Sequence, residues 1–312
     1  TRDARVDTVK IVVHTRKTPP PKRTPRFLPA FLSIEIPSAE ARLVELVATN
    51  GTVLDFTDIS ASGAIRSKTI RIYRGLARLN DLRFDAIGLL TAADPLQIEG
   101  SSRISWTPQG LPRWVMNADI DGDLEALGID GSLSAPFRAR LKRGVLHALG
   151  NWNFDGEAHV FDFDLQAFGA GPVLGKISGD LALGIDKQGY RASGVLESSG
   201  LGVGPFDVGF DGSFAQKVLT ARRIVLVHPG SGAQVEAAGE IGIVENGPRL
   251  ELEGRWQDFR WPLAGAAPVV RSAAGRFKLG EVWPYYLELE GPVEPVPLAL
   301  PPMPLKMSGR LA

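Results

Sequence analysis

Three aspartates in the stretch ADIDGDLEAL are the residues whose spacing comes nearest to metal chemistry. Asp119, Asp121 and Asp123 alternate along the chain, as the acids of a calcium-binding loop do. In such a loop the glycine follows the third acid, whereas Gly122 stands between the second and third. Ile120 also alternates with the acids, as it would in any β-strand. We therefore expect a solvent-exposed strand face here and no metal site.

The histidines offer little for catalysis or metal binding. The chain has four of them, His14, His147, His159 and His228. Only His159 has a carboxylate close by on the same strand face, that of Glu157. A lone strand histidine is typical of a solvated or half-buried position, so a catalytic triad or histidine metal site is not predicted.

Two glycine-rich stretches could be mistaken for phosphate-binding loops. GAGPVLG at 169–175 and GLGVG at 200–204 both miss the dinucleotide fingerprint, and neither opens a helix. No GxSxG nucleophile elbow occurs in the chain. We expect that the protein is not an enzyme and that it binds no cofactor and no metal.

The amino-acid composition excludes further classes of function. The chain has 44% hydrophobic residues, enough to bury apolar surface, and 35 basic against 35 acidic residues. This balance gives no net field that would attract nucleic acid, so we expect no nucleic-acid partner. There is no cysteine and no apolar run long enough to span a bilayer. Because the chain opens on TRDARVDTVK and ends within the strand-like MSGRLA, we expect it to be a segment of a longer protein.

Alternation with a period of two is the main structural signal. In LELEGRW, Leu250 and Leu252 share one face of a strand, while Glu251 and Glu253 share the other. A glycine closes this unit at Gly254, and alternating stretches that end in glycine recur along the chain. The recurring glycines are Gly100, Gly122, Gly156, Gly179, Gly212, Gly239, Gly254, Gly291 and Gly309. Glycine within a strand permits a bulge or a sharp bend, so the repeats predict a sheet that curls.

Turn residues place hairpins between these strands. Asn50-Gly51 and Asn246-Gly247 each separate two alternating stretches, and weaker turn signals lie at 107–112 and 186–189. No convincing amphipathic helix is present. The sequence predicts an all-β fold: an elongated, curled antiparallel sheet of roughly twenty strands, folded as an open groove. We expect one continuous segment over 1–312, with a first repeat region at 33–106, middle hairpin repeats at 107–248 and Trp-containing repeats at 249–312.

The stretch 15–32, TRKTPPPKRTPRFLPAFL, breaks the alternation. Proline-rich chain cannot join a sheet ladder, so this is a linker or surface loop. It is either a solvated loop stapled to the sheet by its apolar residues or a patch that rests on anionic headgroups. The basic residues of that possible membrane-surface patch are Arg16, Lys17, Lys22, Arg23 and Arg26.

The segment GRWQDFRWPLAG, with the strands VVRSAAGRFKLG and YYLELEG that follow, resembles repeats of the TamB family. Residues 39–106 are similar to the opening β region of that family. TamB proteins are the inner-membrane-anchored part of the translocation and assembly module, and they belong to the AsmA-like bridge-like lipid transfer proteins. The most specific part of the resemblance is the cluster of Trp256, Trp261 and Pro262 after a glycine.

The resemblance implies a periplasmic β-sheet of a Gram-negative bacterium that conducts phospholipid between the inner and outer membranes. The family's N-terminal membrane helix and its C-terminal domain, which serves the outer-membrane barrel partner, are not matched by this segment. The inner-membrane anchor and the barrel contact are therefore expected of other parts of the full-length protein.

Alternation, together with this resemblance, predicts which residues line an apolar groove for acyl chains. For each of them, packing in a closed core against a facing sheet is the alternative. Trp256 continues the face of Leu252, and Trp261 before Pro262 is expected to leave the ladder at the groove rim. The predicted lining residues are Ile70, Ile72, Phe84, Phe161, Phe163, Leu165, Leu250, Leu252, Trp256, Phe277, Leu279, Leu287 and Leu289.

Two other functions share these sequence features. A closed β-solenoid would have small stacked residues at a strict period, but here the spacing varies and the aromatic residues are large. A scaffold or chaperone for outer-membrane β-barrel assembly would use exposed strand edges, which invite pairing by another strand. The sequence leaves this second function open.

Overall fold

The computed structural model describes most of the chain, and nearly all of what it describes is β-strand. The described residues are 4–12, 25–47, 53–107, 112–123, 125–148, 152–164, 166, 175–199, 204–215, 218–244, 247–263, 267–282, 284–298 and 300–310. Within them, helix is confined to short 3-10 turns such as Val296–Leu298. No helix among these residues is long and apolar enough to cross a membrane. Leu165 and the basic residues Arg16, Lys17, Lys22 and Arg23 lie outside the described ranges.

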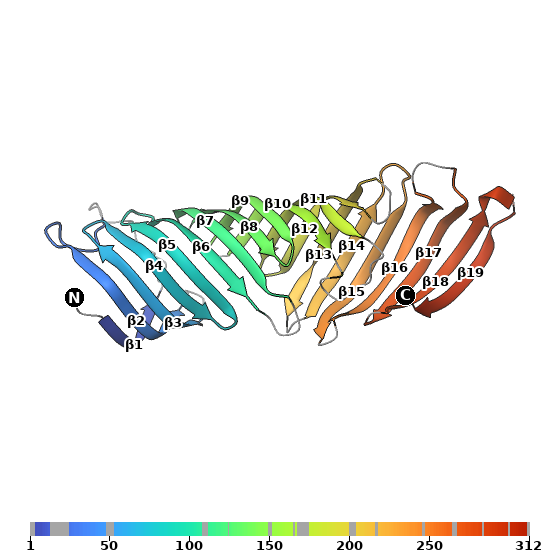
Figure 1. The fold of residues 1–312 in the computed structure, drawn as a ribbon. Coiled ribbons are helices and arrows are strands. Elements are labelled where there is room, and N and C mark those ends of the chain that lie inside the picture. Colours follow the sequence, from blue (N-terminus) through green and yellow to red (C-terminus); the bar gives the residue numbers. More distant parts are fainter. Residues whose placement is uncertain are drawn as a thin grey trace. The chain divides into compact units, whose positions relative to one another are not determined.

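The chain divides into two compact units. Unit 1 comprises residues 1–108, 113–136 and 140–154, and unit 2 comprises residues 109–112, 137–139 and 155–312. Figure 1 shows the strands of each unit lying side by side in a twisted sheet. The strands that lie wholly or mainly in unit 1 are β1 Ala4–Val12, β2 Ile34–Val47, β3 Val53–Ile65, β4 Thr69–Leu79, β5 Leu82–Thr91, β6 Gln97–Trp106, β7 Trp114–Asp123, β8 Leu127–Ala135 and β9 Arg138–His147. Those of unit 2 are β10 Asn153–Asp164, β11 Lys176–Asp186, β12 Gly189–Ser198, β13 Phe206–Ala215, β14 Val218–Val227, β15 Gln234–Val244, β16 Gly247–Trp261, β17 Val270–Glu281, β18 Tyr286–Pro295 and β19 Met303–Arg310.

Successive strands pair as antiparallel neighbours, which confirms the predicted all-β class. Antiparallel pairing runs from β2 to β8 in unit 1 and from β11 to β19 in unit 2. All nineteen strands found among the described residues belong to one mixed sheet. The predicted turn residues Asn50, Gly51 and Asn246 lie outside the described residues, but the strands on either side of them, β2 with β3 and β15 with β16, are antiparallel neighbours.

One pairing departs from the predicted antiparallel pattern. β1 runs parallel to β2, with Val6 opposite Ala41. Parallel neighbours need a crossover connection of about a dozen residues or more, and the chain between β1 and β2 is long enough to supply it. Arg42 on β2 donates two hydrogen bonds to Asp7 on β1, at 2.7 and 3.0 Å. These bonds, aided by Thr8, lower the pKa of the Asp7 carboxyl to about 2.

The repeat glycines fall into two kinds. Gly122, Gly179 and Gly239 have φ of 131°, 152° and 145°, values that side-chain-bearing residues rarely adopt. They supply the backbone irregularity that the sequence predicts for a curling sheet. Gly212 and Gly254 instead adopt ordinary strand conformations and lie beneath aromatic rings of the neighbouring strand. This second role was not predicted.

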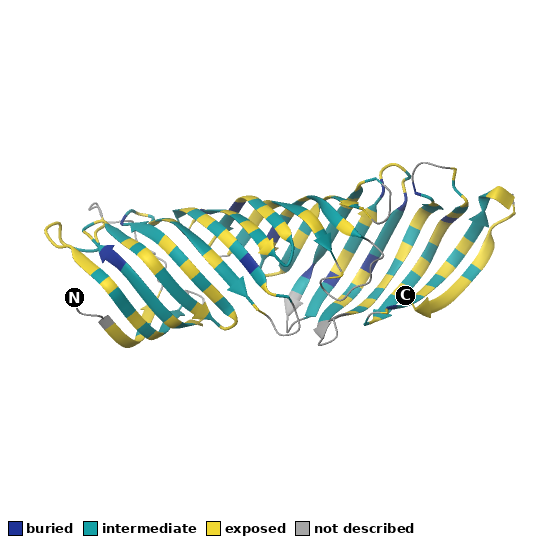
Figure 2. Cartoon of the chain, in the orientation of Figure 1, coloured by how far each residue is buried: buried dark blue, intermediate teal, exposed yellow. Residues whose placement is uncertain are grey.

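The sheet has little sealed core. No large side chain in the described part of the chain is fully buried, and five of the nine buried hydrophobic residues are alanines. The exposed surface is 19328 Å², whereas a compact protein of 33.5 kDa would expose about 12,700 Å². Figure 2 shows exposed and half-buried residues alternating along the strands, with few buried ones. Large areas of the sheet are therefore not covered by a second layer of described residues.

Candidate functional site

One face of unit 2 is apolar without interruption across nine strands. The register aligns residues of β11 to β19 into rows that cross the sheet at right angles to the strands, and two adjacent rows contain no charged residue. The first row is Ile185, Tyr190, Gly212, Ala221, Gly239, Leu252, Leu279, Leu287 and Gly309. The second row is Leu183, Ala192, Phe210, Ile224, Ala237, Gly254, Phe277, Leu289 and Met307.

These rows place most of the predicted lining residues of unit 2 together. Leu252, Leu279 and Leu287 are direct cross-strand neighbours, and so are Phe277 and Leu289. Leu250 and Trp256 flank them on β16, two residues from Leu252 and Gly254 respectively, and therefore share the same face. We call this surface the apolar face of unit 2.

The opposite face carries paired charges. Glu236 accepts hydrogen bonds from Arg255 and Arg223, which lower the pKa of its carboxyl. Lys278 donates to Glu253 at 2.6 Å, and this contact raises the pKa of the lysine. Further pairs on this face join Arg276 to Glu290 and Arg222 to Asp211. Exposed pairs such as these add little stability, but they keep this face hydrated and soluble.

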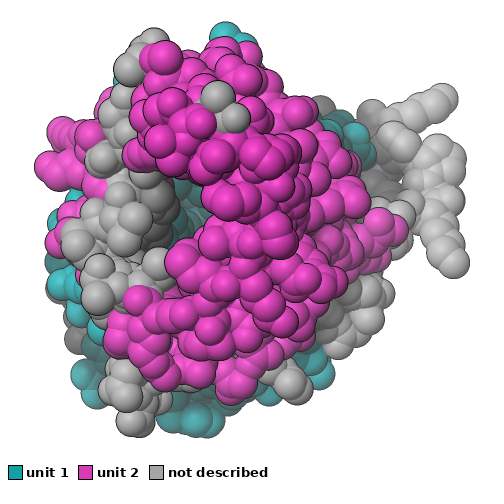
Figure 3. Space-filling view, turned by 90° about the vertical axis from the view of Figure 1, so that its right-hand side faces the viewer, with its two compact units in different colours: residues 1–108, 113–136, 140–154 teal, residues 109–112, 137–139, 155–312 magenta. Residues whose placement is uncertain are grey.

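Large apolar side chains are less exposed in the middle of the apolar face than on the charged face opposite it. On the charged face Val195 is 44% exposed, and in unit 1 Ile87 is 54% exposed. In the middle of the apolar face, Leu252, Phe210 and Leu279 are half-buried although no second layer of described residues covers them. At the two ends of the rows, Ile185 and Met307 are 41% and 49% exposed. Side chains on the concave side of a curved sheet crowd together and shield one another. Seen from its end, unit 2 curves round a hollow (Figure 3), and the apolar face has the exposure expected of its inner side.

Trp256 is held flat against the sheet. Its indole N–H donates to the Ser272 hydroxyl at 2.8 Å, and that buried hydroxyl donates to the Pro292 carbonyl at 2.6 Å. The ring covers Gly275, directly opposite on β17, and reaches Gly291 on β18, so that a side chain at either glycine would collide with it. Trp256 thus forms part of the floor of the apolar face.

The same arrangement of ring over glycine recurs at other strands. Phe277 lies over Gly254, and Tyr190 lies over Gly212, in each case directly across the register. The Tyr190 hydroxyl donates to the Thr220 carbonyl at 3.3 Å, and its ring stacks on that of Phe210. Burial raises the pKa of Tyr190 to about 12. Rings that lie flat over glycines leave a smooth apolar surface.

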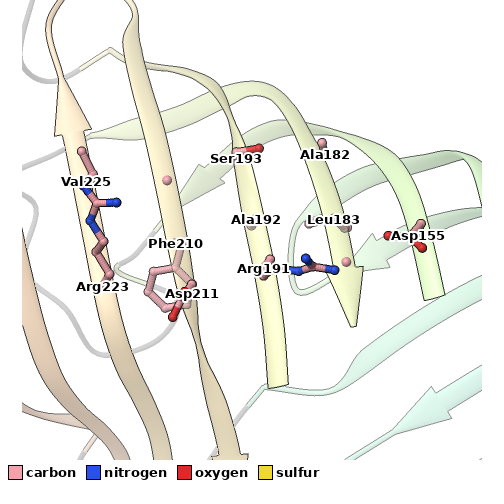
Figure 4. A pocket seen from close by; sticks show the side chains of 12 residues that line it. Asp155, Ala182, Leu183, Arg191, Ala192, Ser193, Phe210, Asp211, Arg223 and Val225 are labelled. Atoms are coloured by element: carbon pink, nitrogen blue, oxygen red, sulfur yellow. The ribbon is translucent and has the colours of Figure 1, made fainter. Parts of the chain in front are cut away.

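A shallow hollow on the charged face of unit 2 is a weaker candidate site. It occupies about 490 Å³ over β11 to β14, where Ala182, Gly184, Ser193 and Gly209 leave space between longer side chains. Figure 4 shows Arg191, Arg223, Asp211 and Asp155 around it. Two of its charged residues already have partners, since Asp211 pairs with Arg222 and Arg223 with Glu236. The hollow therefore offers no group of free charges aimed at a ligand.

Unit 1 has an apolar face of the same construction across β2 to β8. Ile70 and Ile72 lie on it as predicted, and so does Phe84, whose ring contacts that of Phe56. Its first row is Ile34, Ile65, Ile70, Leu90, Ile98, Gly122 and Leu127. Its second row is Ile36, Gly63, Ile72, Gly88, Gly100, Ile120 and Ile129.

Phe161 does not share a face with Phe163, contrary to the prediction. Its ring contacts that of His159, which bonds to Asp180 at 2.7 Å on the charged face. Asp162 between the two phenylalanines has a φ of 47°, and this left-handed residue breaks the alternation. Phe163 turns the other way and contacts the ring of Phe137. Leu165, the third residue predicted here, lies outside the described residues.

Trp261 remains in the ladder, also contrary to expectation. It pairs with Val270, and its carbonyl accepts a hydrogen bond from the Val269 N–H at 2.8 Å. The chain leaves the sheet one residue later, at Pro262, which has no N–H to contribute. Trp261 is 44% exposed at this strand end, a position compatible with a rim.

The acids that resembled a calcium loop lie on β7 within the sheet. Asp119 stands opposite Asp130, and Asp121 stands opposite Glu99. Among the residues that the structure describes, no three histidine or acidic side chains gather closely enough to hold a metal ion.

Sequence reasoning missed several residues of the two apolar faces. Tyr190 and Phe210 in unit 2 and the contacting rings of Trp106 and Trp114 in unit 1 were not singled out. The sequence contains part of the information needed to find the pair of Tyr190 and Gly212, because Tyr190 follows a predicted turn and Gly212 is one of the repeat glycines. Finding the pair requires the strand register, which alternation alone does not supply.

Comparison with known proteins identifies no relative of this chain. No family model matches it, and neither a curated protein nor a solved structure matches it.

Proposed function

We propose that the apolar faces of both units bind the acyl chains of phospholipid and let them move along the sheet. The observation that carries this proposal is the pair of uncharged rows in unit 2, nine strands long, with no covering layer of described residues. A sealed core would contain fully buried large side chains, and none is found in the described part of the chain. The uncovered rows therefore favour a binding face over a closed core.

The free-energy cost of exposing acyl chains to water explains what such a face would be used for. Two acyl chains hold about thirty methylenes, and exposing each one to water costs about 0.8 kcal/mol, a total of roughly 20 kcal/mol or more. An apolar surface that stays in contact with the chains removes most of this cost. The paired charges of the opposite face stay in water, so that the protein remains soluble while it carries lipid.

The resemblance to TamB repeats also supports the proposal that the chain binds lipid. On this basis we propose that the chain is a periplasmic segment of a bridge between the inner and outer membranes of a Gram-negative bacterium. In this role it catalyses no reaction. Its partners are phospholipid directly, and the inner membrane and the outer-membrane barrel partner through other parts of the full-length protein.

Mass spectrometry of the purified chain tests the proposal. The protein is produced in a Gram-negative host, purified without detergent, and measured first under native and then under denaturing conditions. We expect phospholipid to remain bound through purification and to be released on denaturation. A folded protein that is free of lipid would contradict the proposal and would favour a scaffold that pairs with strands of other proteins.

A further inference from the structure

The turn at residues 29–32 in unit 1 exposes an aromatic side chain to solvent. The Leu32 N–H donates to the Pro29 carbonyl at 3.0 Å, which closes the turn. Phe31, between them, is 91% exposed, more than any other large hydrophobic residue that the structure describes, and Leu32 is 41% exposed. A phenylalanine held in this way gains nothing from folding, because its apolar surface stays in water.

Hydrogen bonds fix this turn to the sheet. The N–H groups of Phe27 and Leu28 donate to the Ser67 carbonyl, at 2.8 and 3.4 Å. Ser67 lies in the connection between β3 and β4, whose own geometry is set by the bond from the Arg66 N–H to the Thr69 carbonyl at 2.8 Å. Phe31 is therefore presented from a backbone anchored at several points.

Basic residues surround the base of the turn. Arg66 and Lys68 flank Ser67, Arg26 precedes Phe27, and all three side chains are exposed. The neighbouring connection after β5, tied in by the bond from the Ala92 N–H to the Lys68 carbonyl, adds one acid, Asp94. The loops next to the turn, after β3 and after β5, thus carry more positive than negative charge, and the next acidic loop residue at this strand end is Glu125, between β7 and β8. In the sequence, the residues just before the turn, 15–25, add four further basic residues and no acid.

We propose that this turn is an interfacial anchor for an anionic bilayer surface. Phe31 and Leu32 enter the boundary between headgroups and acyl chains, and Arg26, Arg66 and Lys68 contact lipid phosphates. An apolar tip ringed by cations fits such a surface, because the tip leaves water while each cation keeps a hydrated anionic partner. The anchor does not depend on the apolar faces of the sheet, and it brings unit 1 to the membrane from which lipid is taken or to which it is delivered.

Labelling at a single cysteine tests the insertion directly. The chain has no cysteine, so Phe31→Cys carries one environment-sensitive fluorophore, and Ile87→Cys, an exposed apolar position on the sheet of the same unit, is the matched control. With vesicles of equal parts phosphatidylcholine and phosphatidylglycerol, we expect a blue shift and quenching by brominated acyl chains at position 31 only. No shift at position 31, or equal shifts at both positions, would overturn the proposal.

Vesicle sedimentation supplies the second measurement. Phe31→Ser is expected to lower binding to the anionic vesicles about tenfold, because the ring no longer gains from leaving water, whereas Ile87→Ser leaves binding unchanged. Binding should also weaken with salt and be lost on pure phosphatidylcholine. Unchanged binding by Phe31→Ser would overturn the anchor. The lipid that co-purifies with Phe31→Ser should match the parent protein, so failure of the anchor and failure of the lipid-binding face can be told apart.

Discussion

Leu252→Asp is expected to reduce the phospholipid bound to unit 2 about thirtyfold, the largest effect on binding that we predict for a single substitution. Leu252 lies in the middle of a row, between Gly239 and Leu279. An acyl chain that avoids the new carboxylate leaves two or three methylenes in water, at about 0.8 kcal/mol each, or roughly 2 kcal/mol. The measurement is the lipid content of the purified protein and the affinity of the emptied protein for a fluorescent phospholipid.

The control for this prediction uses one residue type on two faces. Ile72→Asp in unit 1 changes a residue of the apolar face and is expected to act as Leu252→Asp does. Ile87→Asp, on the neighbouring strand, changes the opposite face of unit 1, which Arg83 and Asp85 share with Ile87 along β5. It is expected to leave bound lipid unchanged, since Ile87 is already half exposed to water. If the two isoleucine variants lost lipid equally while both remained folded, the assignment of faces in unit 1 would be wrong.

Gly275→Val is expected to give the largest loss of stability, about 2 to 4 kcal/mol, by displacing the Trp256 ring. A Cβ at Gly275 would collide with the indole ring, which must then leave its position and give up its hydrogen bond to Ser272. The buried Ser272 hydroxyl loses a partner, and the apolar floor loses a ring. Denaturant unfolding measures the loss of stability, and tryptophan fluorescence reports the change in environment.

Gly280→Val is the matched control on the same strand. A Cβ at Gly280 would meet nothing nearer than the Leu250 carbonyl oxygen at 3.8 Å, so valine fits there without moving a neighbour. We expect it to change stability by less than about 1 kcal/mol, since valine suits a strand better than glycine does. Equal effects of the two substitutions would show that backbone freedom, and not the seated ring, explains the glycine at position 275.

The alternation of apolar and polar residues was enough to predict the strands and, for most of them, which side chains share a face. Leu250, Leu252, Leu279 and Leu287 lie on a common face because alternation is a property of the extended backbone. The antiparallel pairing of β15 with β16 was equally predictable, since Asn-Gly between two alternating stretches is typical of a hairpin.

What the sequence could not show depends on single backbone angles and on register. Phe161 faces the charged side because Asp162 adopts a left-handed conformation, which nothing in the neighbouring alternation indicates. The parallel pairing of β1 depends on a long crossover, which composition does not reveal. Gly254 under Phe277 and Gly291 at the edge of Trp256 were expected to bend the sheet, because their contact with a ring becomes visible only when the neighbouring strands are aligned.

Photocrosslinking at neighbouring positions on opposite faces is the most direct test of whether the apolar face of unit 2 binds acyl chains. A benzophenone amino acid is placed at Leu279, on the apolar face, or at Gly280, on the charged face where there is space for it. After irradiation in cells, mass spectrometry identifies what is attached. We predict phospholipid adducts at position 279 and none at position 280. Adducts at both positions, or only protein adducts at position 279, would contradict the assignment of this face to lipid.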